Sequence, residues 1–134
     1  MDRMIKAVIN GKETPLNYSI EVMFNVTDKF GDIQTALDTI AKDSKEGFEA
    51  VVWFAVQMAN DAELCRRAEG YEPQPMIKAS EIPKRMRPWE FNELRDAVCD
   101  AIALGYKREI PPDENEEIDL TLMELEAKKA DAGE

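Results

Sequence analysis

The most constraining feature of the sequence is an almost entirely apolar run from residue 48 to residue 59, in which only Glu49 and Gln57 are polar. Ser44 lies shortly before this run, and the pattern predicts one long helix over residues 45–70. A helix that is apolar nearly all round is normally the central, buried helix of a bundle. The rest of the chain is therefore expected to supply the elements that cover it.

The first 18 residues predict a β-hairpin. Asn10 and Gly11 are the residue pair that favours a two-residue turn with positive φ at both positions. This turn pairs Ile9 with Lys12 and places alternate side chains on the same face of the ribbon. An isolated two-stranded ribbon is only marginally stable, so the hairpin must pack on helices. The apolar face available for that packing consists of Ile5, Ala7, Ile9, Leu16 and Tyr18.

Capping residues predict the remaining helices. Ser19 is an N-cap, and Gly31 is the C′ residue that ends the same helix. Asp32 is the N-cap of the next helix. Pro88 occupies the first turn of the last core helix, for which Gly105 is the natural C′ residue.

A chain of 134 residues is long enough for one domain of this kind. We expect a mainly α (α+β) fold, in which an N-terminal hairpin packs on a small bundle of about four to five helices and an acidic tail follows. The expected boundaries are a single globular domain at 1–108, made of a hairpin at 1–18 and a helical body at 19–105, then an acidic linker and tail at 109–134 with a short helix at 121–130.

Charge is unevenly distributed along the chain. The formal net charge is −11, and residues 109–134 hold ten acidic and two basic side chains, a net of −8. This acidity argues against nucleic acid as a ligand, because neutralising phosphates requires Lys and Arg. No apolar run approaches the ~20 residues of a membrane span, and the N-terminus lacks a signal-peptide core. We therefore expect a cytoplasmic protein that binds neither nucleic acid nor membrane.

The sequence lacks the side chains that most catalytic sites require. It contains no histidine, and its two cysteines, Cys65 and Cys99, do not have the spacing of a metal site. We expect both thiols to be reduced and half-buried. Asp61 and Glu63 are two residues apart on a helix, which favours a solvated helix face over an acid–base pair. We expect no enzymatic activity, no cofactor and no metal.

Residues 16–33 carry more apolar side chains than one helix face needs. The stripe of larger side chains is expected to be mostly core, covered by the hairpin and the long helix. It consists of Ile20, Met23, Phe24, Thr27 and Phe30. Val22 and Val26 widen the stripe toward a second side, and we expect these two to bind a partner together with the adaptable Met23.

The end of the long helix offers a second candidate. Arg66, Arg67 and Tyr71 follow one another closely, and with Trp53 they would make a pocket for an anion or a peptide. Alternatively, the two arginines neutralise nearby acids at a helix C-terminus, where cations are favoured. The sequence leaves both interpretations open.

The C-terminal part of the chain offers a third candidate. Thr121 and Glu124 have the spacing of a capping box, which predicts a short helix whose apolar contacts would include Leu122 and Leu125. The one basic cluster of the sequence is too small for a nucleic-acid footprint but could receive an acidic tail, its own or that of another chain. This cluster consists of Lys84, Arg85 and Arg87.

The stretch "INGKETPLNYSIEVMF" is a hairpin that passes directly into an apolar helix, and "WFAVQMANDAELCRRAEGY" and "EIDL" follow it. In this order of features the chain resembles the tail assembly chaperones of long-tailed bacteriophages and prophages, of the small G type. The resemblance implies a protein that binds the tape measure protein, keeps it soluble and helps to recruit subunits of the major tail tube protein. It also implies absence from the mature virion, and it assigns no catalytic residue.

Two further expectations come from charge and exposed surface. The net charge leaves open an acidic phage-encoded inhibitor or DNA mimic that binds a host nucleic-acid-binding protein. The position of that charge, mostly in a tail and not on a rigid face, weakens this alternative. Pro15 leaves a free edge on the second strand, and the helices have spare apolar surface, so we expect a homo-oligomer.

Overall fold

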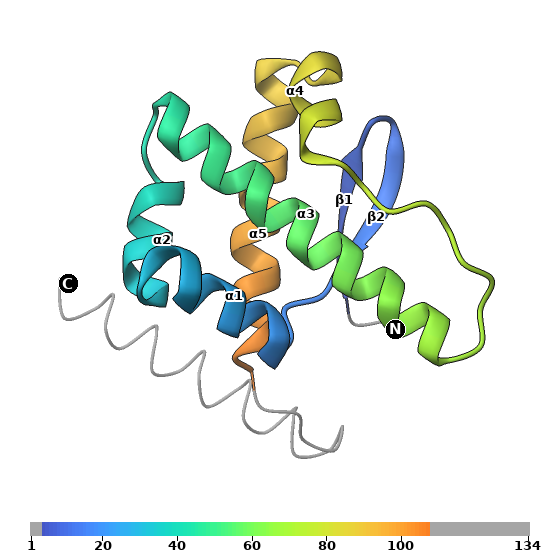
Figure 1. Ribbon diagram of the computed structural model, residues 1–134. Coiled ribbons are helices and arrows are strands. Elements are labelled where there is room, and N and C mark those ends of the chain that lie inside the picture. Colours follow the sequence, from blue (N-terminus) through green and yellow to red (C-terminus); the bar gives the residue numbers. More distant parts are fainter. Residues whose placement is uncertain (1–3, 108–134) are drawn as a thin grey trace, which may run out of the picture.

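The computed structural model describes residues 4–107 and has a two-stranded hairpin followed by a set of helices (Figure 1). This confirms the expected mainly α fold with an N-terminal hairpin. The expected tail helix at 121–130, with Leu122 and Leu125, lies outside the described residues. The elements are β1 (Ile5–Ile9), β2 (Lys12–Leu16), α1 (Ile20–Phe30), α2 (Ile33–Ile40), α3 (Lys45–Ala68), the 3-10 helix η1 (Ala79–Glu81), α4 (Ile82–Arg85) and α5 (Pro88–Gly105).

Helix α3 lies at the centre of the fold, as its apolar run predicts. It crosses the molecule in Figure 1, with α1 and α2 on one side, the hairpin on the other and α5 behind it. The Ser44 hydroxyl caps the helix by accepting a hydrogen bond from the Gly47 N–H at 3.2 Å. Phe54, Ala55 and Met58 are fully buried, so the middle of α3 is the middle of the core.

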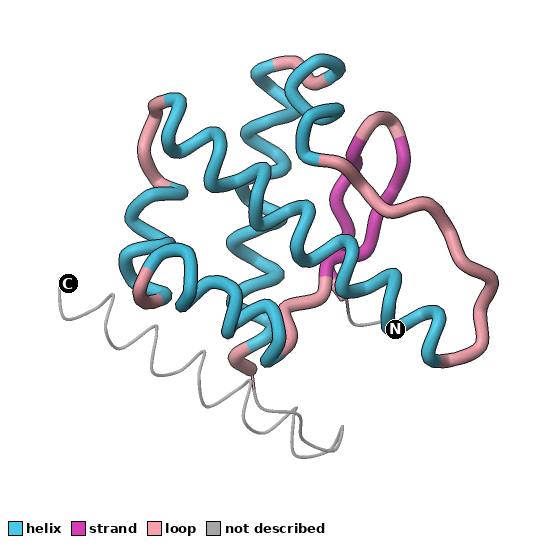
Figure 2. Tube along the Cα trace, viewed as in Figure 1, coloured by secondary structure: helices cyan, strands magenta, loops and turns pink. Residues whose placement is uncertain are grey.

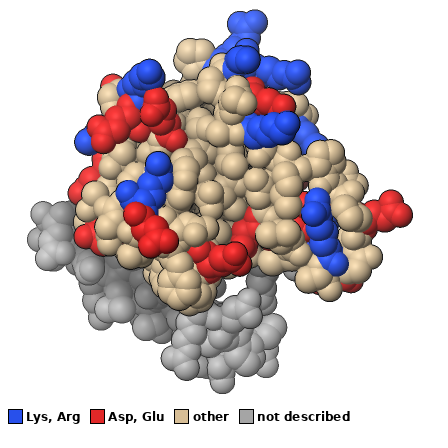
Figure 3. All heavy atoms as spheres, in the orientation of Figure 1, with Lys and Arg blue, Asp and Glu red and all other residues tan. Residues whose placement is uncertain are grey.

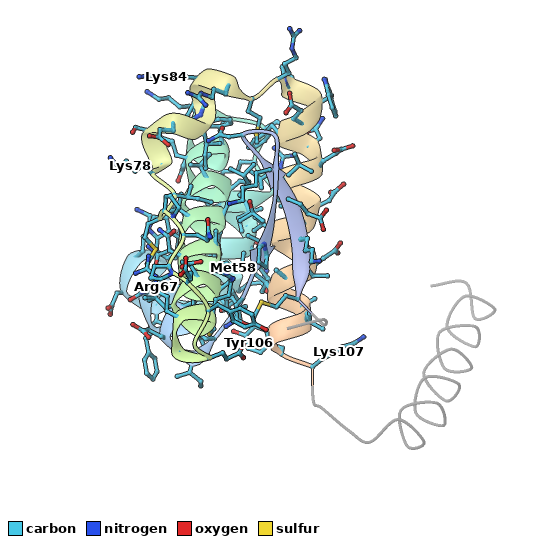
Figure 4. All side chains as sticks on the ribbon, turned by 90° about the vertical axis from the view of Figure 1, so that its right-hand side faces the viewer. Met58, Arg67, Lys78, Lys84, Tyr106 and Lys107 are labelled. Carbon is cyan, nitrogen blue, oxygen red and sulfur yellow. The ribbon has the colours of Figure 1, made fainter. Side chains whose placement is uncertain are left out.

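The hairpin has the predicted register, with Ile9 opposite Lys12. Asn10 and Gly11 both have positive φ, 53° and 77°, as a type I′ turn requires. Strand β1 packs on α5 and β2 packs on α3, so the ribbon joins the two helices (Figure 4). The Asn17 N–H, just after β2, donates a hydrogen bond of 3.0 Å to the Met58 carbonyl in the middle of α3.

Helix α5 differs from the sequence prediction at its end. Gly105 was expected as the C′ residue, but it is the last residue of α5 and Tyr106 is the C-cap. Glycine is needed at position 105 because the backbone of α5 approaches Tyr18 closely there. A Cβ at this position would lie 2.6 Å from Cδ2 of Tyr18. The Tyr18 and Tyr106 hydroxyls are 3.2 Å apart, and burial together with this contact raises the pKa of Tyr18. The end of α5 is therefore fixed against the start of α1.

Candidate partner-binding surface

Helix α1 carries an exposed apolar surface. Ile20 and Phe24 lie one turn apart, and their side chains are 63% and 59% exposed. Leu64 of α3 is 49% exposed, one turn beyond Asp61, and Asp61 contacts the N-cap of α1. We call these three residues, Ile20, Phe24 and Leu64, the α1 surface. Exposed apolar side chains grouped in this way mark sites of interaction with other proteins.

The prediction that Val22 and Val26 form the exposed flank of α1 is wrong. These two side chains are 2% and 1% exposed and belong to the core, whereas Met23 is half-buried. Two side-chain hydrogen bonds hold the valine edge against α3. The Ser19 hydroxyl donates to Asp61 at 3.0 Å. The Asn25 amide donates to Gln57 at 3.0 Å.

The prediction that the stripe of large side chains is mostly core is wrong, because Ile20, Phe24 and Thr27 are exposed and only Met23 and Phe30 are half-buried. Phe30 is half-buried, stacks on Phe54 at a centroid distance of 5.8 Å, and meets Trp53 edge-on at 5.5 Å. The ammonium group of Lys29 lies 5.7 Å from the centroid of the Trp53 ring. This cation–π contact stabilises Lys29 at the edge of the aromatic cluster. The exposed apolar side chains of the stripe, Ile20 and Phe24, thus lie in the first two turns of α1.

Arg66 and Arg67 do come together with Tyr71, but around a buried carboxylate. The Arg66 guanidinium donates to Oε1 of Glu63 at 2.6 Å, and the Arg67 Nε donates to Oε2 at 2.9 Å. Arg66 also lies over the Tyr71 ring at 5.4 Å. The structure therefore supports the interpretation in which the arginines neutralise nearby acids. Trp53 does not contribute to this group, since it packs with Phe30 and Phe54.

Glu63 was expected on a solvated helix face, and this expectation is wrong. The carboxylate is buried because it anchors the long loop between α3 and η1 (Figure 2). The Gln74 N–H of this loop donates to Oε2 at 2.8 Å, and Arg67 donates to the Gln74 carbonyl at 2.9 Å. First the Gln74 N–H, then Arg67 and Arg66, lower the pKa of Glu63 to about 2 against the opposing effect of burial.

We expect Glu63→Gln to lower the free energy of unfolding at neutral pH, because the two guanidinium groups lose their counter-charge. The folded pKa of about 2 lies below the ordinary 4.5, so the stabilisation is complete above pH 4.5 and is lost as the pH falls toward 2. Urea unfolding of the wild type and of Glu63→Gln at several pH values should therefore show that the difference in their free energies of unfolding shrinks as the pH is lowered.

Glu49→Gln is the matched control, since Glu49 is an exposed glutamate of the same helix whose nearest cation, Lys45, is 3.9 Å away. This variant should stay close to the wild type at every pH. A deficit of Glu63→Gln that is equally large at pH 5 and near pH 2 would contradict the role assigned to the buried charge.

Neither cysteine is poised for chemistry. Burial, followed by the charges of Asp61 and Glu69, raises the pKa of the half-buried Cys65. Cys99 is exposed and not half-buried as expected. Partial desolvation of its thiol by neighbouring atoms, followed by the charges of Asp96 and Asp100, raises its pKa as well. Both groups are therefore protonated, weakly nucleophilic thiols at neutral pH.

Three remaining findings bear on the class of the protein. Among residues 4–107, no three His, Cys, Asp or Glu side chains are grouped so that they could hold a metal ion. In that part of the chain, no helix combines the length and the apolarity needed to cross a membrane. No protein-family model, curated protein or solved structure matches this chain.

Proposed function

We propose that the protein is a non-enzymatic tail assembly chaperone of a long-tailed bacteriophage or prophage. It binds the tape measure protein in the host cytoplasm, keeps it soluble and helps to recruit tail tube subunits. The observation that supports this most directly is the exposure of Ile20 and Phe24 on a helix that is otherwise fixed to the core. The resemblance of the hairpin and the following helix to this class of chaperone supports it as well.

The α1 surface is suited to an amphipathic helix. Its two α1 side chains have i,i+4 spacing, so they present one apolar ridge to a partner helix of matching periodicity. Glu21 and Asp28 are exposed on the same helix. A partner segment with apolar residues at i, i+3 and i+4 and flanking Lys or Arg would therefore complement both the shape and the charge of this face.

Co-expression tests the proposal. The tape measure protein encoded beside this gene should be largely insoluble alone, should move to the soluble fraction when co-expressed with this chain, and should co-purify with it. An unrelated aggregation-prone helical protein should gain little solubility, because it lacks the matched segment. If the tape measure protein is equally insoluble with and without this chain, and no complex is recovered, the proposal is wrong.

A further inference from the structure

Basic side chains gather at the α4 end of the molecule. Figure 3 shows blue side chains over α4 at the top of the view, and Figure 4 shows Lys78 and Lys84 at that same end. We call this group the basic cap; it consists of Lys78, Lys84, Arg85 and Arg87, all exposed. None of the four forms an ion pair with another of residues 4–107. With Glu81 and Glu90 included, residues 76–90 carry a net charge of +2 in an acidic protein.

The basic cap rests on a fixed base. Ile82 of α4 is completely buried in the core. The Asn60 side chain of α3 accepts a hydrogen bond from the Ile77 N–H at 2.9 Å and donates one to the Ile77 carbonyl at 3.2 Å. Because the backbone under the four cations is already ordered, an anionic segment that binds there does not have to order it.

Apolar side chains are exposed next to the cations. Trp89, two residues after Arg87, is 61% exposed, and Met76 is also exposed. An acidic segment followed by apolar residues would match this face. Residues 113–117 of this chain, with the sequence DENEE, are followed by Ile118 and Leu120 and have that order of charge and apolarity.

The chain leaves the described domain at the end opposite the basic cap, which makes it difficult for segment 113–117 to contact the cap of its own chain. Lys107 lies at the opposite end from Lys84 in Figure 4, and the 18-residue α5 between them is about 27 Å long. Six residue steps from Lys107 to Asp113 span at most about 21 Å. Within one chain, only Glu116 and Glu117, the last acids of the segment, could therefore contact the cap, and only if residues 107–117 ran fully extended along the surface.

We propose that the basic cap binds the acidic segment 113–117 of a second copy of this chain, with Trp89 and Met76 contacting the apolar residues that follow. In a two-fold pair each copy gives its tail to the other's cap, so the second contact forms within an existing complex and strengthens the first. This surface is separate from the α1 surface, since α4 lies at the top of Figure 1 and α1 near the bottom. The two proposals can therefore fail independently.

Sedimentation of the full-length chain tests this assignment. The wild type should self-associate at about 50 mM salt, and the association should weaken strongly at about 1 M salt, where the screening length falls to about 3 Å. Lys84→Glu/Arg85→Glu/Arg87→Glu should raise the dissociation constant by about tenfold or more. Glu114→Lys/Glu116→Lys/Glu117→Lys should do the same from the other side of the contact.

A mixture of the two charge-reversed chains gives the sharpest result. Each reversed chain repels itself, but the acidic tail of one fits the intact basic cap of the other, and the basic tail fits the reversed cap. The mixture should therefore associate although neither chain does so alone. Lys6→Glu/Lys12→Glu/Lys45→Glu, which changes the net charge equally outside the cap, should associate like the wild type.

Three outcomes would overturn the assignment. A wild type that is monomeric at all salt and protein concentrations excludes the second copy. If that monomer expands when the cap is reversed, the cap holds the tail of its own chain. An oligomer that neither salt nor either charge reversal affects uses another surface.

Discussion

Gly47→Ala should lower the free energy of unfolding by at least about 2 kcal/mol, although alanine is the better helix former. Gly47 is buried in the first turn of α3, where the loop from α2 crosses it. A Cβ there would collide with the carbonyl oxygen of Lys42 and lie 3.0 Å from that of Thr39. Both obstacles are backbone atoms, so the clash can be relieved only by moving the end of α2 and the loop at Lys42 away from α3.

Urea denaturation of Gly47→Ala and Lys45→Ala measures this effect. Lys45 lies two residues earlier in the same turn with an exposed side chain, so its replacement should change stability by no more than about 0.5 kcal/mol. A Gly47→Ala chain as stable as the wild type would show that the backbone of residues 39–42 does not approach α3 as closely as described.

Ile20→Gln/Phe24→Gln should abolish solubilisation of the tape measure protein while leaving the fold intact. Both side chains are largely exposed and glutamine is a good helix former, so each change should alter the free energy of unfolding by no more than about 0.5 kcal/mol. The apolar ridge offered to a partner helix would nevertheless be gone. The soluble fraction of the co-expressed partner and the unfolding curve of the isolated variant are the two measurements.

Val22→Ala/Val26→Ala is the complementary control on the same helix. Truncating these two buried side chains together should lower the free energy of unfolding by about 2–4 kcal/mol, while the exposed ridge of Ile20 and Phe24 stays unchanged. The folded fraction of this variant should still bind the partner. If instead the glutamine variant solubilises the partner as well as the wild type does, the α1 surface is not the binding site.

Features of the fold that depend on neighbouring residues could be predicted from the sequence. The Asn10-Gly11 turn alone determines which residues of the two strands face each other. The N-caps Ser19 and Ser44 are also local, because each side chain bonds a backbone N–H three residues ahead in the chain. Such features require no knowledge of where the remaining helices lie.

The rotation of α1 about its axis could not be predicted in this way. Its stripe of large side chains and its valine edge are similarly apolar, so periodicity gives no preference for either. Hydrogen bonds to Asp61 and Gln57, which lie more than 30 residues away in the sequence, determine that the valine edge of α1 faces α3. The valine edge is also the edge that carries Asn25, a polar residue that can bond across a helix contact, and this was the one signal available.

Glu63 and Leu64 were missed for a related reason. The second half of α3 reads as a solvated helix, and the loop that buries Glu63 and leaves Leu64 exposed has no periodic pattern. What places this loop is a backbone N–H, that of Gln74, which every non-proline residue possesses. Sequence reasoning cannot recognise a partner of that kind.

The packing of β1 on α5 has a consequence for how the protein is made. The first strand of the described chain packs on its last helix, so the apolar face of the hairpin has no complete binding site until residues 88–105 have been synthesised. Contacts so distant in sequence form late and slowly compared with local ones. During synthesis, Ile5, Ala7 and Ile9 therefore lack the contacts with α5 until most of the chain has been made. A protein proposed to shield the apolar segments of another chain therefore has an incompletely covered apolar segment of its own while it is being synthesised.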